Sequence, residues 1–227
     1  MTPTPRLFAD EITNLLNYLA EADLAISTSS VARAKGLVTW HRRLDAGEFL
    51  PQRRHPTIET YRAWVANSDY SAMLFDGALL QITYEFSDYG LVRHRLAYVP
   101  CPFDVDPELW RTSPFLDVID LYAEGAAKDV VLRATLRFDF DTEAAAKGHP
   151  AAHFTINATS CRVGCIAPMR LGQFANFVFR HFYPELWQAH PFFSRMSQAP
   201  AGARSLTFEE AQSAHIAWAL KSVSSME

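Results

Sequence analysis

Residues 70–99, YSAMLFDGALLQITYEFSDYGLVRHRLAYV, decide the fold class, because the apolar residues here change to a period of two. This alternation is typical of strands, whose side chains point to opposite faces of a sheet in turn. The dipeptide Asp76-Gly77 is the strongest short signal for a tight hairpin turn. A second turn follows at residues 87–90, and Pro100 ends the run. The pattern predicts a three-stranded antiparallel meander.

Two further strands are expected in the second half of the chain. Residues 130–141 alternate between apolar side chains and a polar set that includes Arg137 and Asp139. Such a strand covers a core with one face only. Residues 151–158 alternate again, with His153 on the polar side.

Apolar residues at helical spacing predict helices on both sides of these strands. The expected helices span residues 7–24, 57–66, 116–123, 170–183 and 208–220, and a short strand is expected at 37–40. We therefore expect an α+β fold, in which one antiparallel sheet of about five or six strands is packed by N- and C-terminal helices.

The composition predicts a globular protein. Of the 227 residues, 49% are hydrophobic, which allows a sizeable core, and the net charge of −4 argues against a chain coated with phosphate-binding cations. Three cysteines are too few for a disulfide-stapled secreted fold. The first residues lack the pattern of a signal peptide, and no apolar run approaches the roughly 20 residues of a membrane span. We expect one cytoplasmic domain over residues 1–227, without membrane contact.

The two later strands suggest a site. Their apolar faces must coincide if they pair, and we assume a register that satisfies this condition, in which Asp139 lies opposite His153 and Arg137 lies opposite Thr155. A carboxylate orients an imidazole, and arginine binds phosphate in a bidentate way. We therefore take His153, Asp139, Arg137 and Arg162 as candidate catalytic residues, with His153 as general acid or base. The alternative to a catalytic site is a solvated polar face of the sheet with weak ion pairs.

A zinc site is a second interpretation. His149, His153, Cys161 and Cys165 offer the ligand types that zinc prefers, without the compact C-x2-C spacing of common structural sites. On one extended strand the two histidines would also lie about 13 Å apart, too far for a single ion, although a bend in the loop before Pro150 would bring them closer. We expect neither a metal nor a cofactor.

A local basic run is the other candidate contact site. It comprises Arg42, Arg43, Arg53 and Arg54, with His41 and His55 beside them. Such a run contacts RNA phosphates in some proteins, and more often it forms a solvated loop. Familiar catalytic motifs are missing from the sequence: it has no phosphate-binding glycine loop, no G-x-S-x-G elbow and no H-E-x-x-H.

Several short sequence segments, in this order along the chain, resemble a known family. DGALLQITYEF, HRLAYVP, RFDFD, HPAAHF and CR followed by PMR resemble a family of bacterial proteins known only as a domain of unknown function, from about Ile58 to Tyr183. The resemblance implies a shared fold and no assigned activity. A more remote likeness is to TumE-type toxins, through an Arg-x-Asp strand and a histidine-rich turn. The comparable positions are Arg137, Asp139, His149 and His153, in a chain that is longer and poorer in histidine.

Two functions of different classes follow. The first is a subunit that docks on a protein partner in a bacterial accessory or defence system, as the aromatic-rich C-terminal half and the absence of a catalytic motif indicate. The second is a metal-independent phosphodiester hydrolase of the ribonuclease or toxin type, with the His153, Asp139 and arginine site. An exposed apolar surface would favour the first, and a polar hollow around Arg137 would favour the second.

Overall fold

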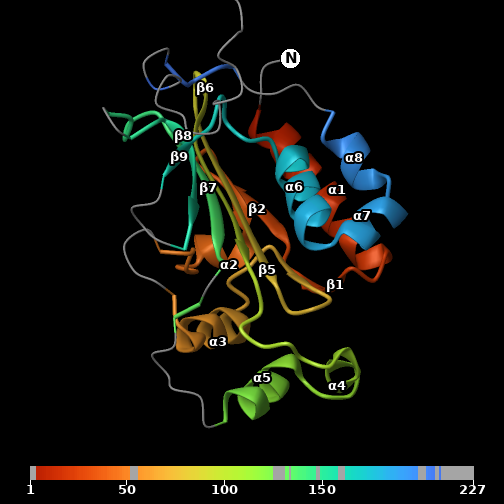
Figure 1. Ribbon diagram of the computed structural model, residues 1–227. Helices are drawn as coiled ribbons and strands as arrows, with labels where there is room; N and C mark the ends of the chain where they lie inside the picture. Colours follow the sequence, from red (N-terminus) through yellow and green to blue (C-terminus); the bar gives the residue numbers. More distant parts are fainter. Residues whose placement is uncertain are drawn as a thin grey trace, which may run out of the picture.

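The computed structural model describes residues 4–51, 56–124, 131–132, 134–146, 149–157, 162–198, 203–207 and 210 (Figure 1). Within these residues, nine strands form one antiparallel sheet and eight helices pack around it. The strands are β1 (Ala25–Thr28), β2 (Val31–Ala34), β3 (Leu37–Trp40), β4 (Ala72–Leu74), β5 (Leu79–Ser87), β6 (Gly90–Val99), β7 (Leu136–Asp141), β8 (Ala152–Ile156) and β9 (Val163–Gly164). The helices are α1 (Pro5–Glu21), α2 (His41–Leu44), α3 (Ile58–Asn67), α4 (Pro107–Thr112), α5 (Phe115–Ala123), α6 (Leu171–Phe182), α7 (Pro184–Ala189) and α8 (Phe192–Met196).

The sheet is built around the long hairpin of β5 and β6. On one side of this hairpin β6 pairs with β7, and β8 and β9 follow in order. On the other side, β4 pairs with the beginning of β5 and β3 with its end. β1 then extends the sheet beyond β4, and β2 extends it beyond β3.

One face of the sheet is covered by α1, α6, α7 and α8 (Figure 1). α1 is capped by Thr4, whose Oγ1 accepts a hydrogen bond from the Leu7 N–H. The buried residues of α1 recur at helical spacing and include Phe8, Ile12, Leu15, Leu16 and Leu19. They share one apolar cluster with α6 and with Leu136 and Phe138 of β7. Because side chains alternate along a strand, the polar side chains of β7 point to the opposite face.

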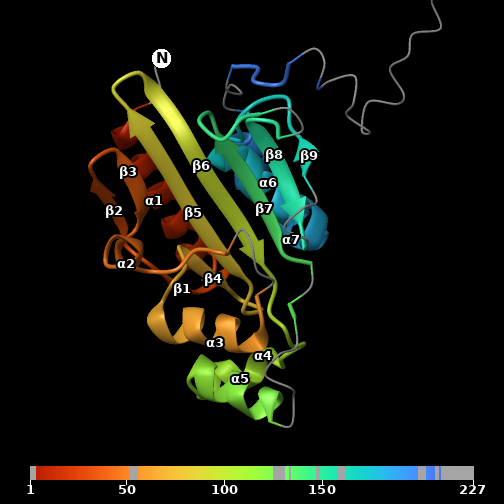
Figure 2. The same ribbon diagram turned by 90° about the vertical axis from the view of Figure 1, so that its left-hand side faces the viewer.

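A second apolar cluster lies on that opposite face, at the end where α3 and α5 pack (Figure 2). The Asp76-Gly77 turn belongs to this end, since the Tyr61 hydroxyl donates to the Gly77 carbonyl at 2.6 Å. Gly77 has a φ of +84°, and a Cβ there would come within 2.5 Å of the Phe115 ring. Only glycine suits both demands, so the turn residue also fixes how closely α5 approaches the sheet.

The expected α+β class with one antiparallel sheet is confirmed, and so is the meander of β4, β5 and β6. The expected number of strands is wrong, because β1, β2 and β9 have only four, four and two residues, too few to be recognised as strands from the sequence. β7 begins at Leu136 rather than near residue 130, after Ala134, whose φ of +60° is incompatible with a strand.

The expected helices at 7–24, 57–66, 116–123 and 170–183 correspond to α1, α3, α5 and α6. The one expected at 208–220 lies almost wholly outside the described residues. None of the described helices combines the length and the apolar character needed to cross a membrane.

Candidate functional site

A row of polar side chains crosses the sheet on the face away from α1 and α6. Thr83 of β5 is the register partner of Arg95 on β6, Arg95 is the partner of Asp139 on β7, and Asp139 is the partner of His153 on β8. Arg137 lies opposite Thr155 in the neighbouring row. We call Thr83, Arg95, Asp139, His153, Arg137 and Thr155 the polar band. The expected pairing of β7 with β8 is therefore confirmed residue by residue.

Asp139 is the centre of the polar band and is only 4% exposed. Its Oδ2 accepts a hydrogen bond from Arg137 Nε at 2.6 Å, and His153 Nε2 lies 3.6 Å from the same oxygen. Its Oδ1 lies 3.7 Å from Arg95 Nε and has no hydrogen-bond partner among the described residues. One buried carboxylate thus serves two guanidinium groups and an imidazole, which makes it the counter-ion on which their burial depends.

Arg137 connects the polar band to the loop between α2 and α3. Its Nη1 donates to the carbonyl oxygens of Leu50 and Pro51, at 3.4 and 2.9 Å, and its Nε is bound to Asp139. Gln81 holds the same loop from β5, because its Oε1 accepts a hydrogen bond from the Leu50 N–H at 2.8 Å. The Arg137 guanidinium therefore holds the loop between α2 and α3 against the sheet. Most of its N–H donors already bind a carboxylate or one of two carbonyls.

His153 is held on both sides of its ring. Nδ1 lies 3.0 Å from the Pro150 carbonyl oxygen, which can only accept, so Nδ1 carries the proton. Nε2 faces Asp139, and the ring is 4% exposed. Burial lowers the pKa of His153, while Asp139 works in the opposite direction. The ring is therefore oriented, as a catalytic histidine must be, but neither nitrogen points to an open space where a substrate could lie.

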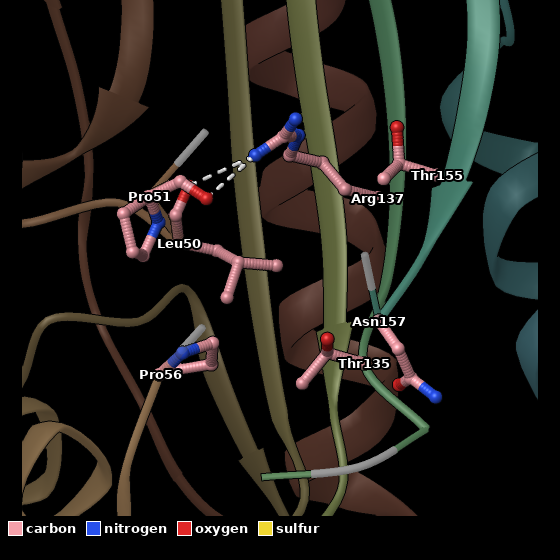
Figure 3. Close-up of a pocket in the computed structure, with 7 residues that line it drawn as sticks. All are labelled: Leu50, Pro51, Pro56, Thr135, Arg137, Thr155 and Asn157. Carbon is pink, nitrogen blue, oxygen red and sulfur yellow. Dashed lines mark hydrogen bonds between the residues drawn. The ribbon is translucent and has the colours of Figure 1, made fainter. Parts of the chain in front are cut away.

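A small cavity lies beside Arg137, under the Leu50–Pro51 loop (Figure 3). Its lining residues are Leu50, Pro51, Pro56, Thr135, Arg137, Thr155 and Asn157, and its volume is about 20 Å³. That volume accommodates roughly one water molecule. A hollow around Arg137, which would favour a hydrolase, therefore exists, but it is too small for a nucleotide.

Arg95 is the residue of the polar band that the sequence interpretation missed. Its side chain is 26% exposed, and its Nε lies 3.7 Å from Asp139. It makes no hydrogen bond with any described residue. Burial lowers the pKa of Arg95, and Arg137 and Arg93 add to the effect. The sequence contained the pattern that identifies Arg95. Arg93 and Arg95 are an odd number of residues away from the apolar Leu96 and Tyr98, so both arginines point to the opposite, polar face once β6 is paired with β7.

His94 points to the other face, where it is 1% exposed between Tyr84 and Phe140. Its Nε2 accepts a hydrogen bond from the Met169 N–H at 3.0 Å. Burial lowers the pKa of His94 to about 4. His94 therefore belongs to the helix-covered core and not to the polar band.

The proposed zinc ligands are only partly brought together. The rings of His149 and His153 lie 5.0 Å apart, closer than an extended strand would allow, because the chain bends at Pro150 before β8 begins. The separation of 13 Å applied only to two histidines on one extended strand, and the bend removes that objection. Cys161 lies outside the described residues, Cys165 is a free thiol, and no cluster of three potential metal ligands occurs in the part of the chain that is described.

The remaining predicted site residues are less constrained. Arg162 is exposed just before β9, close enough to His153 to contribute to lowering its pKa. In the basic run, Arg42 is exposed, and Arg43 donates to the Gly47 carbonyl at 2.7 Å. Arg53, Arg54 and His55 lie outside the described residues. An RNA contact through this run therefore stays a prediction.

The chain matches one family. No curated protein and no solved structure matches it, so the likeness to TumE-type toxins also stays a prediction. The model of the family described as uncharacterized conserved protein (DUF2290) matches residues 21–218. This span contains every strand of the sheet and the whole polar band. The chain therefore belongs to the DUF2290 family of uncharacterized conserved proteins.

Proposed function

We propose that the chain is a non-catalytic subunit that docks on a basic partner protein through α4 and α5. The observation that carries this proposal is the charge of residues 101–124. They hold six carboxylates, namely Asp104, Asp106, Glu108, Asp117, Asp120 and Glu124, and one cation, Arg111. Six negative charges and one positive charge give −5, whereas the whole chain has −4, so all other residues together carry +1.

Apolar side chains accompany these charges. Leu121 is 60% exposed, and further apolar side chains of the segment are only partly buried against the core below: Phe103, Leu109, Trp110, Leu116 and Tyr122. We call these six residues and the six exposed carboxylates the α4–α5 surface. Aromatic residues in the middle with charged residues around them are the usual composition of a protein interface.

The position of the α4–α5 surface also suits docking. α4 and α5 lie beyond α3 at the end of the sheet, away from α1, α6, α7 and α8 (Figures 1 and 2). Two of the six carboxylates have a cation partner within the described chain: Asp120 pairs with Arg62, and Glu108 pairs with Arg111. The others are open to a partner whose cations they would attract from a distance.

Replacement of Leu121 by aspartate should weaken partner binding by about tenfold or more, because a charge would replace the most exposed apolar side chain of the α4–α5 surface. The affinity-tagged full chain is used to isolate proteins from its native cells, and each candidate is then purified and titrated against wild type and variant. The matched control is Ile166→Asp, since Ile166 is 65% exposed but precedes α6 on another part of the chain.

The proposal requires a partner that the Ile166→Asp variant retains and the Leu121→Asp variant loses, with an affinity that falls as salt is raised. A chain that retains no protein, or a partner that both variants bind equally, would contradict it.

A phosphodiester hydrolase is the second candidate, because the confirmed register places His153, Asp139 and Arg137 together. Its weakness is that both nitrogens of His153 already face acceptors. We expect no cleavage when the purified chain is incubated with end-labelled RNA or DNA, with or without EDTA. Cleavage that disappears in His153→Ala would replace the proposal with an enzyme, and the EDTA lane would decide whether a metal takes part.

A further inference from the structure

A groove lies between α2 and the strands β2, β3, β5 and β6. Its volume is about 430 Å³, which is within the range of roughly 300–1,000 Å³ that is usual for binding pockets. Most of its walls are apolar side chains, all half-buried except the exposed Ala34: Ala34, Leu37, Leu44, Phe86 and Val92. Lys35 and Glu85 complete the lining. We call these seven residues the β2–α2 groove.

One wall of the β2–α2 groove is the turn between β2 and β3, and Gly36 holds this turn against β5. The Phe86 N–H donates a hydrogen bond to the Gly36 carbonyl oxygen at 2.9 Å. Gly36 has a φ of +80°, and a Cβ there would clash with the Phe86 carbonyl oxygen, so only glycine allows this close approach. The wall is therefore in place without an occupant, which lowers the entropic cost of binding.

The elements around the β2–α2 groove are basic. Residues 30–44 hold no Asp or Glu and four cations: Arg33, Lys35, Arg42 and Arg43. Four positive charges and no negative charge give +4. Three of these side chains are exposed, and none of the four forms an ion pair with the residues that the structure describes. An anionic surface that approached the groove would therefore meet cations that have no other counter-ion.

The carboxylates near the groove reduce this positive charge only in part. Asp45 and Glu48 follow α2 in the sequence, and Asp45 lies 3.4 Å from His41. Glu85 lines the groove, but it is bound to Arg93 at 2.9 Å. With Asp45 and Glu48 included, residues 30–48 still carry four positive and two negative charges, which give +2.

The α4–α5 surface has the complementary composition. Residues 101–124 carry −5, and Leu121 projects among the carboxylates with 60% of its side chain exposed. The β2–α2 groove is an apolar hollow among cations, so both charge and apolar contacts match. β2 and α2 lie at the side of the sheet, whereas α4 and α5 lie beyond α3 at its end (Figure 2). The two surfaces can therefore meet only between two copies of the chain.

We propose that the α4–α5 surface of one copy docks into the β2–α2 groove of a second copy, with Leu121 in the apolar hollow. The inference rests on the α4–α5 surface of the proposed function, and it names a basic surface that this surface meets. Opposite charges steer the approach of the two copies, and apolar burial holds them together. Because two different surfaces meet, the contact is heterologous, and successive copies form a ring or an open chain.

The test is sedimentation velocity of the purified full chain over a range of concentrations, at low and at high salt. We expect wild type to self-associate with a Kd in the micromolar range at low salt, and more weakly at high salt. Leu121→Asp and Leu44→Asp should each weaken self-association about tenfold or more, because each places a charge in the apolar part of the contact. The control Ile166→Asp carries the same charge outside both surfaces and should associate as wild type does.

A mixture of the two defective variants tests whether these two surfaces meet each other. Leu44→Asp retains an intact α4–α5 surface, and Leu121→Asp retains an intact β2–α2 groove. An equimolar mixture should therefore form a 1:1 dimer at concentrations where each variant alone is a monomer, and the dimer should not grow further. A wild type that stays monomeric at low salt, a variant of the two that associates as wild type does, or a mixture that stays monomeric would overturn the inference.

Lys35→Glu is a second groove variant, which keeps the test valid if Leu44→Asp lowers Tm. Lys35 is exposed, so the reversal of its charge should leave Tm unchanged and weaken self-association about fivefold or more. A monomeric wild type with a cellular partner that Leu121→Asp loses would overturn this inference and leave the proposed function intact. Self-association that both groove and surface variants lose, with no other protein retained from cells, would support this inference and contradict a separate partner.

Discussion

Replacement of Asp139 by alanine should lower the free energy of unfolding by about 3–5 kcal/mol. The reason is that Asp139 is the shared counter-ion of Arg137, at 2.6 Å, and of Arg95, at 3.7 Å. Its removal leaves Arg137, which is only 5% exposed, without a carboxylate in a buried site. The loss is measured by urea or guanidinium unfolding at neutral pH.

The neighbouring residue on the same face of β7 is the matched control. Asp141 is also an ion-pair partner, but Arg93 has Glu85 and Glu143 as further carboxylates, and the Asp141 side chain is 18% exposed. Asp141→Ala should therefore cost about 1 kcal/mol or less, as is usual for pairs near the surface. If both substitutions cost the same, the interpretation of Asp139 as a buried counter-ion is wrong.

The shared faces of β7 and β8 could be predicted because a period of two fixes which side chains lie on one face, and the register that pairs Asp139 with His153 was assumed among those that satisfy this condition. A slip of one residue would have turned Phe154 to the polar side and His153 to the helices. The same alternation gave the meander, and the Asp76-Gly77 turn fixed its first hairpin. Strand alternation and the turn depend on residues that are close in the sequence, so they can be predicted from a single sequence.

The roles within the site could not be predicted in the same way. Arg137 is committed to the carbonyls of Leu50 and Pro51, which are far away in the sequence, and His153 is committed to the carbonyl of Pro150. Backbone carbonyls are present at every residue, so the sequence has no signal for which loop crosses the sheet. The strand pair therefore brings His153, Asp139 and Arg137 together, but most of their donors and acceptors are engaged within the chain.

The α4–α5 surface could not be predicted from the sequence, although its charge could be read there. The acidic character of residues 101–124 was visible in the sequence, but the pattern was mixed, because Phe115, Val118 and Ile119 face the core and Leu121 faces outward. Only the packing of α5 against α3 and the Asp76-Gly77 turn separates buried from exposed apolar residues here.

Lowering the pH from 7.5 to 5 should remove about 2 kcal/mol of stability through His94 alone. Burial lowers the pKa of His94 to about 4, whereas the unfolded chain has the ordinary value of about 6.5. As the pH falls below 6.5, His94 binds a proton in the unfolded state but not in the folded state, so unfolding becomes more favourable. The contribution of His94 is complete above pH 6.5 and is lost progressively toward pH 4.

The variant His94→Gln isolates this contribution, because glutamine does not titrate and its side-chain oxygen can still accept the Met169 N–H. Its free energy of unfolding should fall by about 2 kcal/mol less than that of wild type over the same pH interval. His41→Gln is the control, since it makes the same substitution at an exposed histidine, at the start of α2. A His94→Gln variant with an unchanged pH dependence would mean that the ring takes up its proton at the same pH in the folded and the unfolded state, so that it is protonated in the folded protein at pH 5. The Met169 N–H could then no longer donate to it, because a protonated imidazole has no acceptor, and the entry of the chain into α6 would need a different hydrogen bond.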